Sequence, residues 1–233
     1  MNKLRQHRFL FSELVKRDFK KKYKGTVLGM AWSVLAPLLM LLVMRVVFTR
    51  FFGQGMEYYT TFLFCGNLIF LYFNESTTQG MTVLLDNASI FTKINVPKFL
   101  FLFAKNAQTF INFCLTFCVF LLFCILDGVT FTWRFVMLLY PVGCLVLFNL
   151  GVGLIMSALF VFFRDIRYLW TVFTQLLMYA SAIFYDISAY GPKMQAVFHA
   201  NPVFLFIKYF RTVVLEGAVP PAWLHLLIAF DTL

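Results

Sequence analysis

The chain has 233 residues, of which 61% are hydrophobic and 13% are charged. A soluble globular domain has about 45–50% apolar and roughly 25% charged residues, so one soluble core could not bury this much apolar surface. The net charge of +10 would suggest nucleic acid in a soluble protein. Here the basic residues lie beside long apolar runs, which the positive-inside rule explains better, so we expect no nucleic acid. The composition predicts an all-α polytopic membrane protein, because runs of about 20 apolar residues cross a bilayer as helices.

Residues 1–26 form a basic segment that holds nine Lys or Arg. Its apolar side chains recur at helical spacing, at Phe11, Leu14, Val15 and Phe19. This pattern predicts a cytoplasmic amphipathic helix that lies in the membrane interface with its apolar side towards lipid. A plain membrane anchor without any partner explains the same periodicity. The charge of the segment argues against a signal peptide.

Long apolar runs predict six transmembrane helices in residues 27–233. The first run contains Pro37, which bends a helix or ends its first half. The sixth run begins at Trp223 and stops at Leu233, and so short a run cannot span about 30 Å of hydrocarbon. Either the natural chain continues or this last helix is incomplete and does not cross. The first five predicted crossings are residues 27–48, 58–84, 99–126, 134–162 and 168–185.

The second predicted crossing ends in a polar stretch that runs from Asn74 to Gln79. Polar side chains at membrane depth face other protein groups or a water-filled cavity, because lipid cannot hydrogen-bond to them. This helix end is therefore predicted to line a cavity. Glu75, within the stretch, is the carboxylate that sits well inside a crossing.

Three connecting segments differ in composition from the crossings. Residues 85–98 and 163–167 are short loops with basic residues, whereas residues 186–221 contain four prolines. The apolar piece from Val203 to Val214 is too short to cross and is typical of a re-entrant or interfacial helix. If the N-terminus is cytoplasmic, fourteen of the twenty Lys and Arg fall on the inner side. The positive-inside rule then places the two short loops inside and residues 186–221 outside.

The cysteines and histidines predict no metal site. All five cysteines lie in apolar runs without a CxxC pair, and the three histidines show no ligand spacing. Such cysteines are typically small buried residues of helices. We therefore expect no metal, no cofactor and no catalytic residue in this chain.

Four groups of residues occur in an order that resembles one family. The first group is Arg17-Asp18-x-Lys20-x-Lys22-Tyr23 with Gly25-Thr26-x-Leu28-Gly29, Trp32 and Pro37. The others are residues 87–97, the stretch from Gly153 to Ile166, and Asn201-Pro202 followed by Tyr209, Arg211 and Glu216-Gly217. Together they resemble the permease, or transmembrane subunit, of ABC-2 type transporters, in the branch that exports polysaccharide, O-antigen or teichoic acid. Many relatives have Ser-Pro-Ile-x-Tyr-Pro at the end of the fifth helix, whereas this chain has Ser181-Ala182-Ile183-Phe184-Tyr185-Asp186 and lacks both prolines.

The resemblance implies a homodimer driven by a separate ABC ATPase subunit, since the chain has no P-loop GxxxxGK[ST]. ATP and Mg²⁺ then belong to that partner. In the family, the segment that matches residues 85–98 is a coupling helix that docks on the ATPase; an ordinary connecting loop is the alternative. Arg164 and Asp165 are also candidates for contact with the ATPase, although capping of a helix end explains them as well. The coupling candidates are Asn87, Phe91, Lys93, Pro97, Arg164 and Asp165.

The resemblance also implies a cargo: a glycan or polyol-phosphate polymer on an isoprenoid diphosphate lipid, exported across the bacterial cytoplasmic membrane. Basic residues near the cytoplasmic entrance could attract the diphosphate, and positive-inside anchoring explains them equally well. Aromatic side chains beside polar positions could stack on sugar rings. The candidates for the substrate pathway are Lys20, Lys22, Lys24, Trp32, Tyr59, Tyr72, Phe73, Glu75, Tyr179, Tyr185 and Arg211.

Two other functions fit parts of the sequence. One is an ABC-2 exporter of a small molecule or drug. The Arg17-Asp18 to Trp32 motif and the compact loops argue against it, and both do so only by resemblance. The other is a membrane-embedded glycosyltransferase or acyltransferase, which needs acids, bases or histidines that converge near the membrane face. Glu75 has neither a histidine nor a second carboxylate near it in sequence, so the sequence favours a transport subunit over an enzyme.

Overall fold

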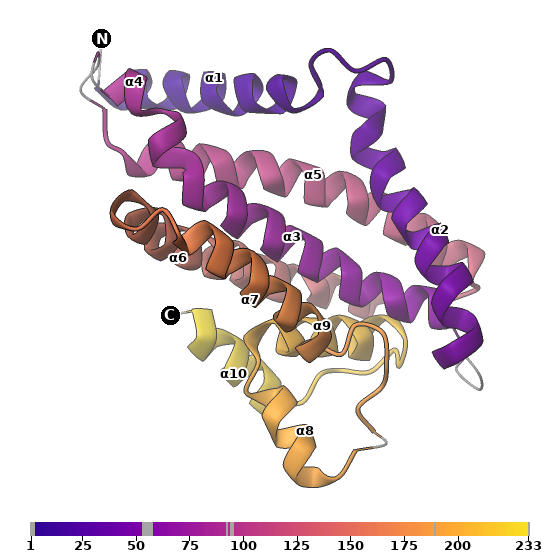
Figure 1. Ribbon diagram of the computed structural model, residues 1–233. Coiled ribbons are helices and arrows are strands. Elements are labelled where there is room, and N and C mark those ends of the chain that lie inside the picture. Colours follow the sequence, from indigo (N-terminus) through magenta and orange to yellow (C-terminus); the bar gives the residue numbers. More distant parts are fainter. Residues whose placement is uncertain (1–2, 53–57, 92, 94–95, 189, 233) are drawn as a thin grey trace.

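The computed structural model describes residues 3–52, 58–91, 93, 96–188 and 190–232 (Figure 1). Every regular element within these residues is helical, and no strand occurs among them. The α-helices are α1 (Lys3–Tyr23), α2 (Trp32–Phe52), α3 (Tyr59–Asp86), α4 (Ala88–Phe91), α5 (Phe99–Leu126), α6 (Leu139–Phe162), α7 (Ile166–Ala180), α8 (Pro192–His199), α9 (Pro202–Val214) and α10 (Ala222–Thr232). Short 3₁₀ turns precede α2 at Gly29–Ala31 and α6 at Trp133–Leu138.

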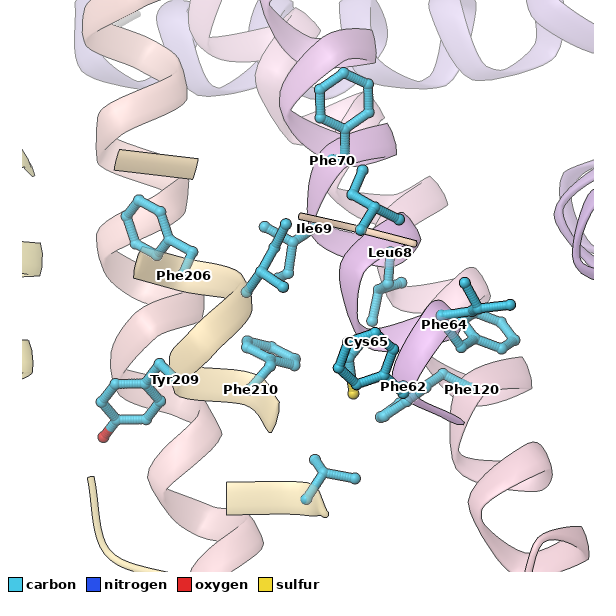
Figure 2. Packing of buried hydrophobic residues seen from close by; sticks show 14 of the residues in the cluster. Phe62, Phe64, Cys65, Leu68, Ile69, Phe70, Phe120, Phe206, Tyr209 and Phe210 are labelled. Atoms are coloured by element: carbon cyan, nitrogen blue, oxygen red, sulfur yellow. The ribbon is translucent and has the colours of Figure 1, made fainter. Parts of the chain in front are cut away.

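Helix α3 is the centre of the bundle. Its first half is mostly apolar and is buried on every side, including the polar residues Thr60, Thr61 and Asn67, as expected of a helix surrounded by others. Figure 2 shows Cys65 and Ile69 of α3 facing Phe206 and Phe210 of α9, while Phe120 of α5 lies against the other side. The main hydrophobic core therefore forms where α3, α5, α6 and α9 meet.

Contacts along α3 set the directions of its neighbours. Helix α5 is antiparallel to it, because Phe64 packs on Phe120 while the Tyr72 hydroxyl, further along α3, donates to Asn106 at 3.0 Å. Helix α6 is parallel to α3, because Phe73 stacks on Phe148 and Gly80 lies against Gly153. The α3–α5 connection and the α6–α7 turn consequently emerge at the same end of the bundle.

The opposite end holds the segment from residue 181 to residue 221. There the backbone N–H and the hydroxyl of Thr61, near the start of α3, both donate to the Asp127 carboxylate, at 3.1 and 2.7 Å. The Tyr59 hydroxyl donates to the carbonyl of Phe184 at 2.8 Å, and Arg134 donates to the carbonyl of Gly217. The two short basic loops that the sequence predicts on the inner side therefore lie at one end of the bundle. The proline-rich segment that it predicts outside lies at the other end.

Helix α1 runs across the end of the bundle from which α4 emerges (Figure 1). Its apolar stripe was expected to face lipid, but Leu14 is buried and packs with Val83, Phe101 and Leu102 of α3 and α5. Packing against protein removes the same apolar surface from water and also fixes the orientation of α1 relative to the bundle. The outer face of α1 keeps its charged residues exposed.

Two helical stretches, Phe99–Leu126 and Trp133–Phe162, are long and apolar enough to cross a bilayer by length and composition. Helix α7 is shorter than predicted and ends at Ala180, since the chain turns at Ser181 and Ala182 has a φ of 48°. At 1.5 Å per residue, its 15 residues rise only about 22 Å. Helix α9 corresponds to the short apolar piece for which a re-entrant or interfacial helix is predicted, and it is almost entirely buried in the core. Six crossings and a re-entrant segment remain predictions.

Candidate functional site: two adjoining cavities at the α1 end

A cavity of about 670 Å³ lies between α2, α3 and α5, and we call it the α2–α3–α5 cavity. Trp32 and Pro37 contribute its α2 wall, and Lys22 at the end of α1 reaches its rim. Four polar residues of the Asn74–Gln79 stretch line it, at helical positions that share one face: Asn74, Glu75, Thr78 and Gln79. Ser76 and Thr77 from the same stretch are instead buried elsewhere in the bundle. One face of this stretch therefore lines a cavity, as the sequence predicts.

Glu75 collects donors from three helices. Its Oε1 accepts from Lys22 Nζ at 2.5 Å, Gln79 Nε2 at 2.9 Å and Asn112 Nδ2 at 3.0 Å. Lys22 lies in the last turn of α1 and Asn112 lies in the middle of α5, so one carboxylate joins α1, α3 and α5. A partly desolvated carboxylate needs such compensation. This arrangement compensates the charge of Glu75 with amides and one ammonium group.

The α5 wall was not predicted. Thr109, Asn112 and Thr116 line the cavity from a helix that otherwise consists mostly of large apolar residues. Their spacing of three and then four residues places them on one helical face. That spacing within an apolar run is the signal from which the sequence could have identified this wall.

A second cavity, of about 380 Å³, lies between α1, α3 and α5, and we call it the α1–α3–α5 cavity. It is lined mostly by charged and amide side chains and shares Lys22 and Gln79 with the first cavity. Asp18 is buried there and bridges Arg17 at 2.7 Å and Lys105 at 3.5 Å. Two cations from different helices thus compensate this buried carboxylate.

The structure connects one of the coupling candidates in residues 85–98 to α1. Asn87 is buried, accepts from Arg17 Nη2 at 2.9 Å and donates to the carbonyl of Val83 at 2.8 Å. It therefore connects α1 to the start of the 85–98 segment, in which Lys93 is exposed and Pro97 is half-buried. The side chain of Phe91 lies outside the described residues, although its backbone completes the single turn of α4.

The family comparison decides what this bundle is. Residues 10–215 match the ABC-2 type transporter family. The chain belongs to the ABC-2 type transporter family. It is 27% identical to an O-antigen export system permease protein RfbA of Myxococcus xanthus, over 95% of this chain and 86% of the relative. Two Klebsiella pneumoniae proteins of the same name are 27% and 25% identical, each over 94% of this chain and 86% of the relative. These relatives are named as permeases, so this ABC-2 chain is a transport subunit and not an enzyme.

Arg164 and Asp165 of the ABC-2 chain are exposed in the α6–α7 turn, at the same end of the bundle as α4. Asp165 precedes the first residue of α7, but its side chain makes no capping hydrogen bond to a described residue. Asp165 therefore occupies the N-cap position of α7 without the side-chain hydrogen bond of a cap, and its role in coupling stays a prediction. Within the described residues, no group of His, Cys, Asp and Glu is arranged to hold a metal ion.

Of the pathway candidates, Lys22, Trp32, Tyr72 and Glu75 line the α2–α3–α5 cavity of the ABC-2 chain. The other seven do not reach it. Lys20 and Lys24 are exposed, and Phe73 is packed in the core against Phe148 and Trp170. Tyr179 and Tyr185 line a separate groove between α7 and α8. Tyr59 and Arg211 have structural contacts at the opposite end.

Proposed function

We propose that this chain is the membrane subunit of an ATP-driven exporter that moves a lipid-linked polysaccharide, of O-antigen or teichoic-acid type, out across the bacterial cytoplasmic membrane. The observation that carries the proposal is the similarity to three proteins named as O-antigen export permeases, which extends over 94–95% of this chain. Similarity over nearly the whole length supports a shared task better than similarity of one segment. In this proposal, ATP and Mg²⁺ are bound by a separate ABC ATPase.

The ATPase would dock at the end of the bundle that holds α1, the 85–98 segment and the α6–α7 turn. The hydrogen bond from Arg17 to Asn87 supports this proposal, because it lets a push on the loop reach α1 directly. Lys93, Arg164 and Asp165 are exposed there and available to a partner. This end would face the cytoplasm, and α8 with the 186–221 segment would face outward, as the distribution of Lys and Arg favours.

A second copy of the chain would complete the transport path. Along α7, only Thr174 is buried, while large apolar residues are exposed. An apolar helix face of this kind is covered either by lipid or by another helix. In the proposed homodimer, closure of the two ATPases would tilt the crossings and open a path between the copies for the glycan.

Depletion of the chain in its native bacterium tests the proposal. Cell-surface polysaccharide and lipid-linked polysaccharide inside the cell are measured before and after depletion. The proposal predicts loss of the surface polymer, accumulation of the lipid-linked form inside, and recovery of both levels when the wild-type chain is restored. Unchanged surface polymer together with increased sensitivity to toxic compounds would instead favour an exporter of small molecules.

A further inference from the structure

The two cavities at the α1 end adjoin each other, because Lys22 and Gln79 line both. One is charged and the other is largely apolar. We propose that together they bind one phosphate-bearing membrane lipid, with its phosphate in the α1–α3–α5 cavity and a hydrocarbon chain in the α2–α3–α5 cavity. The site lies within a single copy of the chain. The inference goes beyond the exporter assignment, since it requires only that the chain lies in a bilayer.

The charges of the α1–α3–α5 cavity favour an anion. Its two carboxylates are Asp18 and Asp86, and its four cations are Arg17, Lys21, Lys22 and Lys105. Even when Glu75 of the neighbouring cavity is counted against Lys22, with which it pairs at 2.5 Å, one positive charge remains in excess. Lys21 is exposed, and Lys105 is 3.5 Å from a carboxylate that Arg17 already contacts at 2.7 Å. Both ammonium groups can therefore turn towards a phosphate.

Gln108 provides an independent indication of a ligand. It lies on α5, lines the α1–α3–α5 cavity and is 1% exposed. Neither its amide nitrogen nor its amide oxygen has a hydrogen-bond partner among the residues that the structure describes. A buried amide without partners costs free energy, so such groups usually meet a ligand or an ordered water. A lipid headgroup offers both the acceptor and the hydroxyl donor that this amide lacks.

The α2–α3–α5 cavity suits a hydrocarbon chain. Apolar side chains from three helices form its walls: Trp32, Met40, Leu68, Leu71 and Phe113. Its polar residues already have partners inside the protein, since Thr109 and Thr116 donate to carbonyls of their own helix at 2.9 and 3.0 Å. Glu75 is compensated by its three donors. An apolar chain can therefore enter without leaving these groups unpaired.

The charged cavity and the apolar cavity follow each other in the same order as the phosphate and the hydrocarbon chain of a lipid. Helix α1 carries eight of the twenty Lys and Arg and borders the charged cavity, and basic amphipathic helices lie at the depth of lipid phosphates. The apolar cavity extends from there along α2 and α3, in the direction of the bundle interior. Both an anionic phospholipid and an isoprenyl phosphate have this chemistry, a phosphate on a hydrocarbon chain.

Native mass spectrometry of the full chain, purified in mild detergent with any subunits that accompany it, tests the proposal. The probes are phosphatidylglycerol, phosphatidylcholine, a long-chain isoprenyl phosphate and inorganic phosphate. The test variant is Lys21→Gln with Lys105→Gln, and its matched control is Lys16→Gln with Lys193→Gln, which removes the same charge away from both cavities. We expect one phosphatidylglycerol or isoprenyl phosphate per chain. The test variant should weaken that binding by about thirtyfold, because each Lys near an anionic lipid contributes about 1 kcal/mol.

A second variant tests whether the α2–α3–α5 cavity binds the hydrocarbon chain, without a change of charge. Ala36 lines the α2–α3–α5 cavity and is exposed, so Ala36→Phe should fill the cavity and reduce lipid binding while the bundle stays folded. Leu39→Phe is its matched control, since Leu39 is exposed on the same helix and lies outside the cavity. Size-exclusion elution and circular dichroism check that each variant is folded.

The result that supports the proposal is a loss of lipid in both test variants with retention in both controls. Tighter binding of phosphatidylglycerol would then assign the site to a membrane phospholipid, and tighter binding of isoprenyl phosphate would assign it to the lipid part of the cargo. Two results would overturn the proposal. One is equal binding of phosphatidylcholine and phosphatidylglycerol that the double variant does not change. The other is binding of inorganic phosphate as tightly as lipid, unaffected by Ala36→Phe.

Discussion

Arg211 is a buried cation whose partners are backbone carbonyls. Its Nη1 donates to Ala182 at 2.9 Å and its Nη2 donates to Ile183 at 2.9 Å and to Phe62 at 3.4 Å. The guanidinium also lies 3.4 Å from the centre of the Phe62 ring. The family resemblance made Arg211 a pathway candidate, but these contacts fasten the turn after α7 to α3. The side chain therefore has structural contacts of its own. It also lines a cavity of about 450 Å³ together with Asp186 and Lys208, so its place in the substrate pathway stays a prediction.

Replacement Arg211→Lys tests this role. Lysine keeps the charge but lacks the planar fork that reaches several carbonyls at once. Hydrogen bonds of charged groups contribute about 1.5–3 kcal/mol each, so we expect a loss of about 2 kcal/mol or more in the free energy of unfolding. Thermal unfolding in detergent measures it as a lower Tm, and Arg45→Lys, at an exposed position of α2, is the control. An unchanged Tm would mean that the carbonyl contacts are unimportant.

The ion pair between Lys22 and Glu75 connects the interface helix to the centre of the bundle. The side chains are 35% and 27% exposed, so solvent screens part of the attraction and the pair is worth more than an exposed one but less than a buried one. We expect a coupling free energy of about 1 kcal/mol in a double-mutant cycle of Lys22→Gln and Glu75→Gln, measured by unfolding in detergent. If the two effects simply add, the pair does not hold α1 in place.

The sequence could identify Glu75 but not its partners. A carboxylate within an apolar run has few explanations other than a protein-lined cavity, so the residue is found without a structure. Lys22 and Asn112 are 53 and 37 residues away along the chain. Their contact depends on how α1 and α5 pack against α3, which local pattern does not determine. For the same reason Phe73, although next to polar positions in sequence, lies in the core on the other side of α3.

At the scale of elements, α3 and α6 approach each other closely at Gly80 and Gly153. A Cβ on Gly80 would lie 3.4 Å from the backbone of Gly153 and 3.3 Å from the side chain of Leu102. Gly80→Leu should therefore force the helices apart and destabilise the fold by about 2 kcal/mol or more. Gly151→Leu on α6 is the matched control, because nothing lies within 4 Å of its Cβ position. Yield and Tm of both variants in detergent measure the difference, and equal values would contradict the close packing.

The contact of α8 with α9 should depend on pH. His199 Nε2 lies 2.8 Å from Lys208 Nζ, which can only donate, so the imidazole is neutral. Burial, and then the charge of Lys208, lower the pKa of His199 below its usual 6.5. The detached state binds the proton more readily, so the contact is present above about pH 6.5 and is lost as the pH falls through the lowered pKa.

Hydrogen exchange of the α8 backbone amides at pH 7.5 and 5.5, corrected for the intrinsic rate, measures this effect. We expect less protection at the lower pH. In His199→Gln the side chain cannot take up a proton but can still accept from Lys208, so the protection should no longer depend on pH. Protection that falls equally in both proteins would assign the effect to another group.

Helices were predictable from sequence where a long apolar run fixes them. The predicted crossing 99–126 coincides with α5, and the run 134–162 differs from the 3₁₀ turn and α6 by one residue. The prediction failed for α7, which ends at Ala180 because the next four residues form a buried turn held by Arg211. It was also incomplete for α1, whose stripe of apolar residues covers protein rather than lipid. Periodicity shows that a helix has an apolar face, but not what covers that face.

For the molecule as a whole, charge and topology agree. The N-terminal segment and the two short basic loops, which with the start of α5 carry fourteen of the twenty Lys and Arg, lie at or near one end of the bundle. The proline-rich segment lies at the other end. A membrane protein with this asymmetry is oriented by it. An energy source that acts at the basic end can move α1 and the 85–98 segment together, since Asn87 joins them. These features are consistent with the proposal that an ATPase acts on the chain from the cytoplasmic side.

The most direct test of the exporter assignment is purification of the tagged chain from its native membrane in mild detergent, followed by mass spectrometry of the proteins and lipids that accompany it. We expect to find a second copy of this chain, an ATPase with a P-loop, and a glycan attached to an isoprenoid lipid. An ATPase without such a glycolipid would contradict the proposed cargo and favour a small-molecule exporter. Absence of any ATPase, under conditions that keep other membrane complexes intact, would contradict the proposed ATP-driven mechanism.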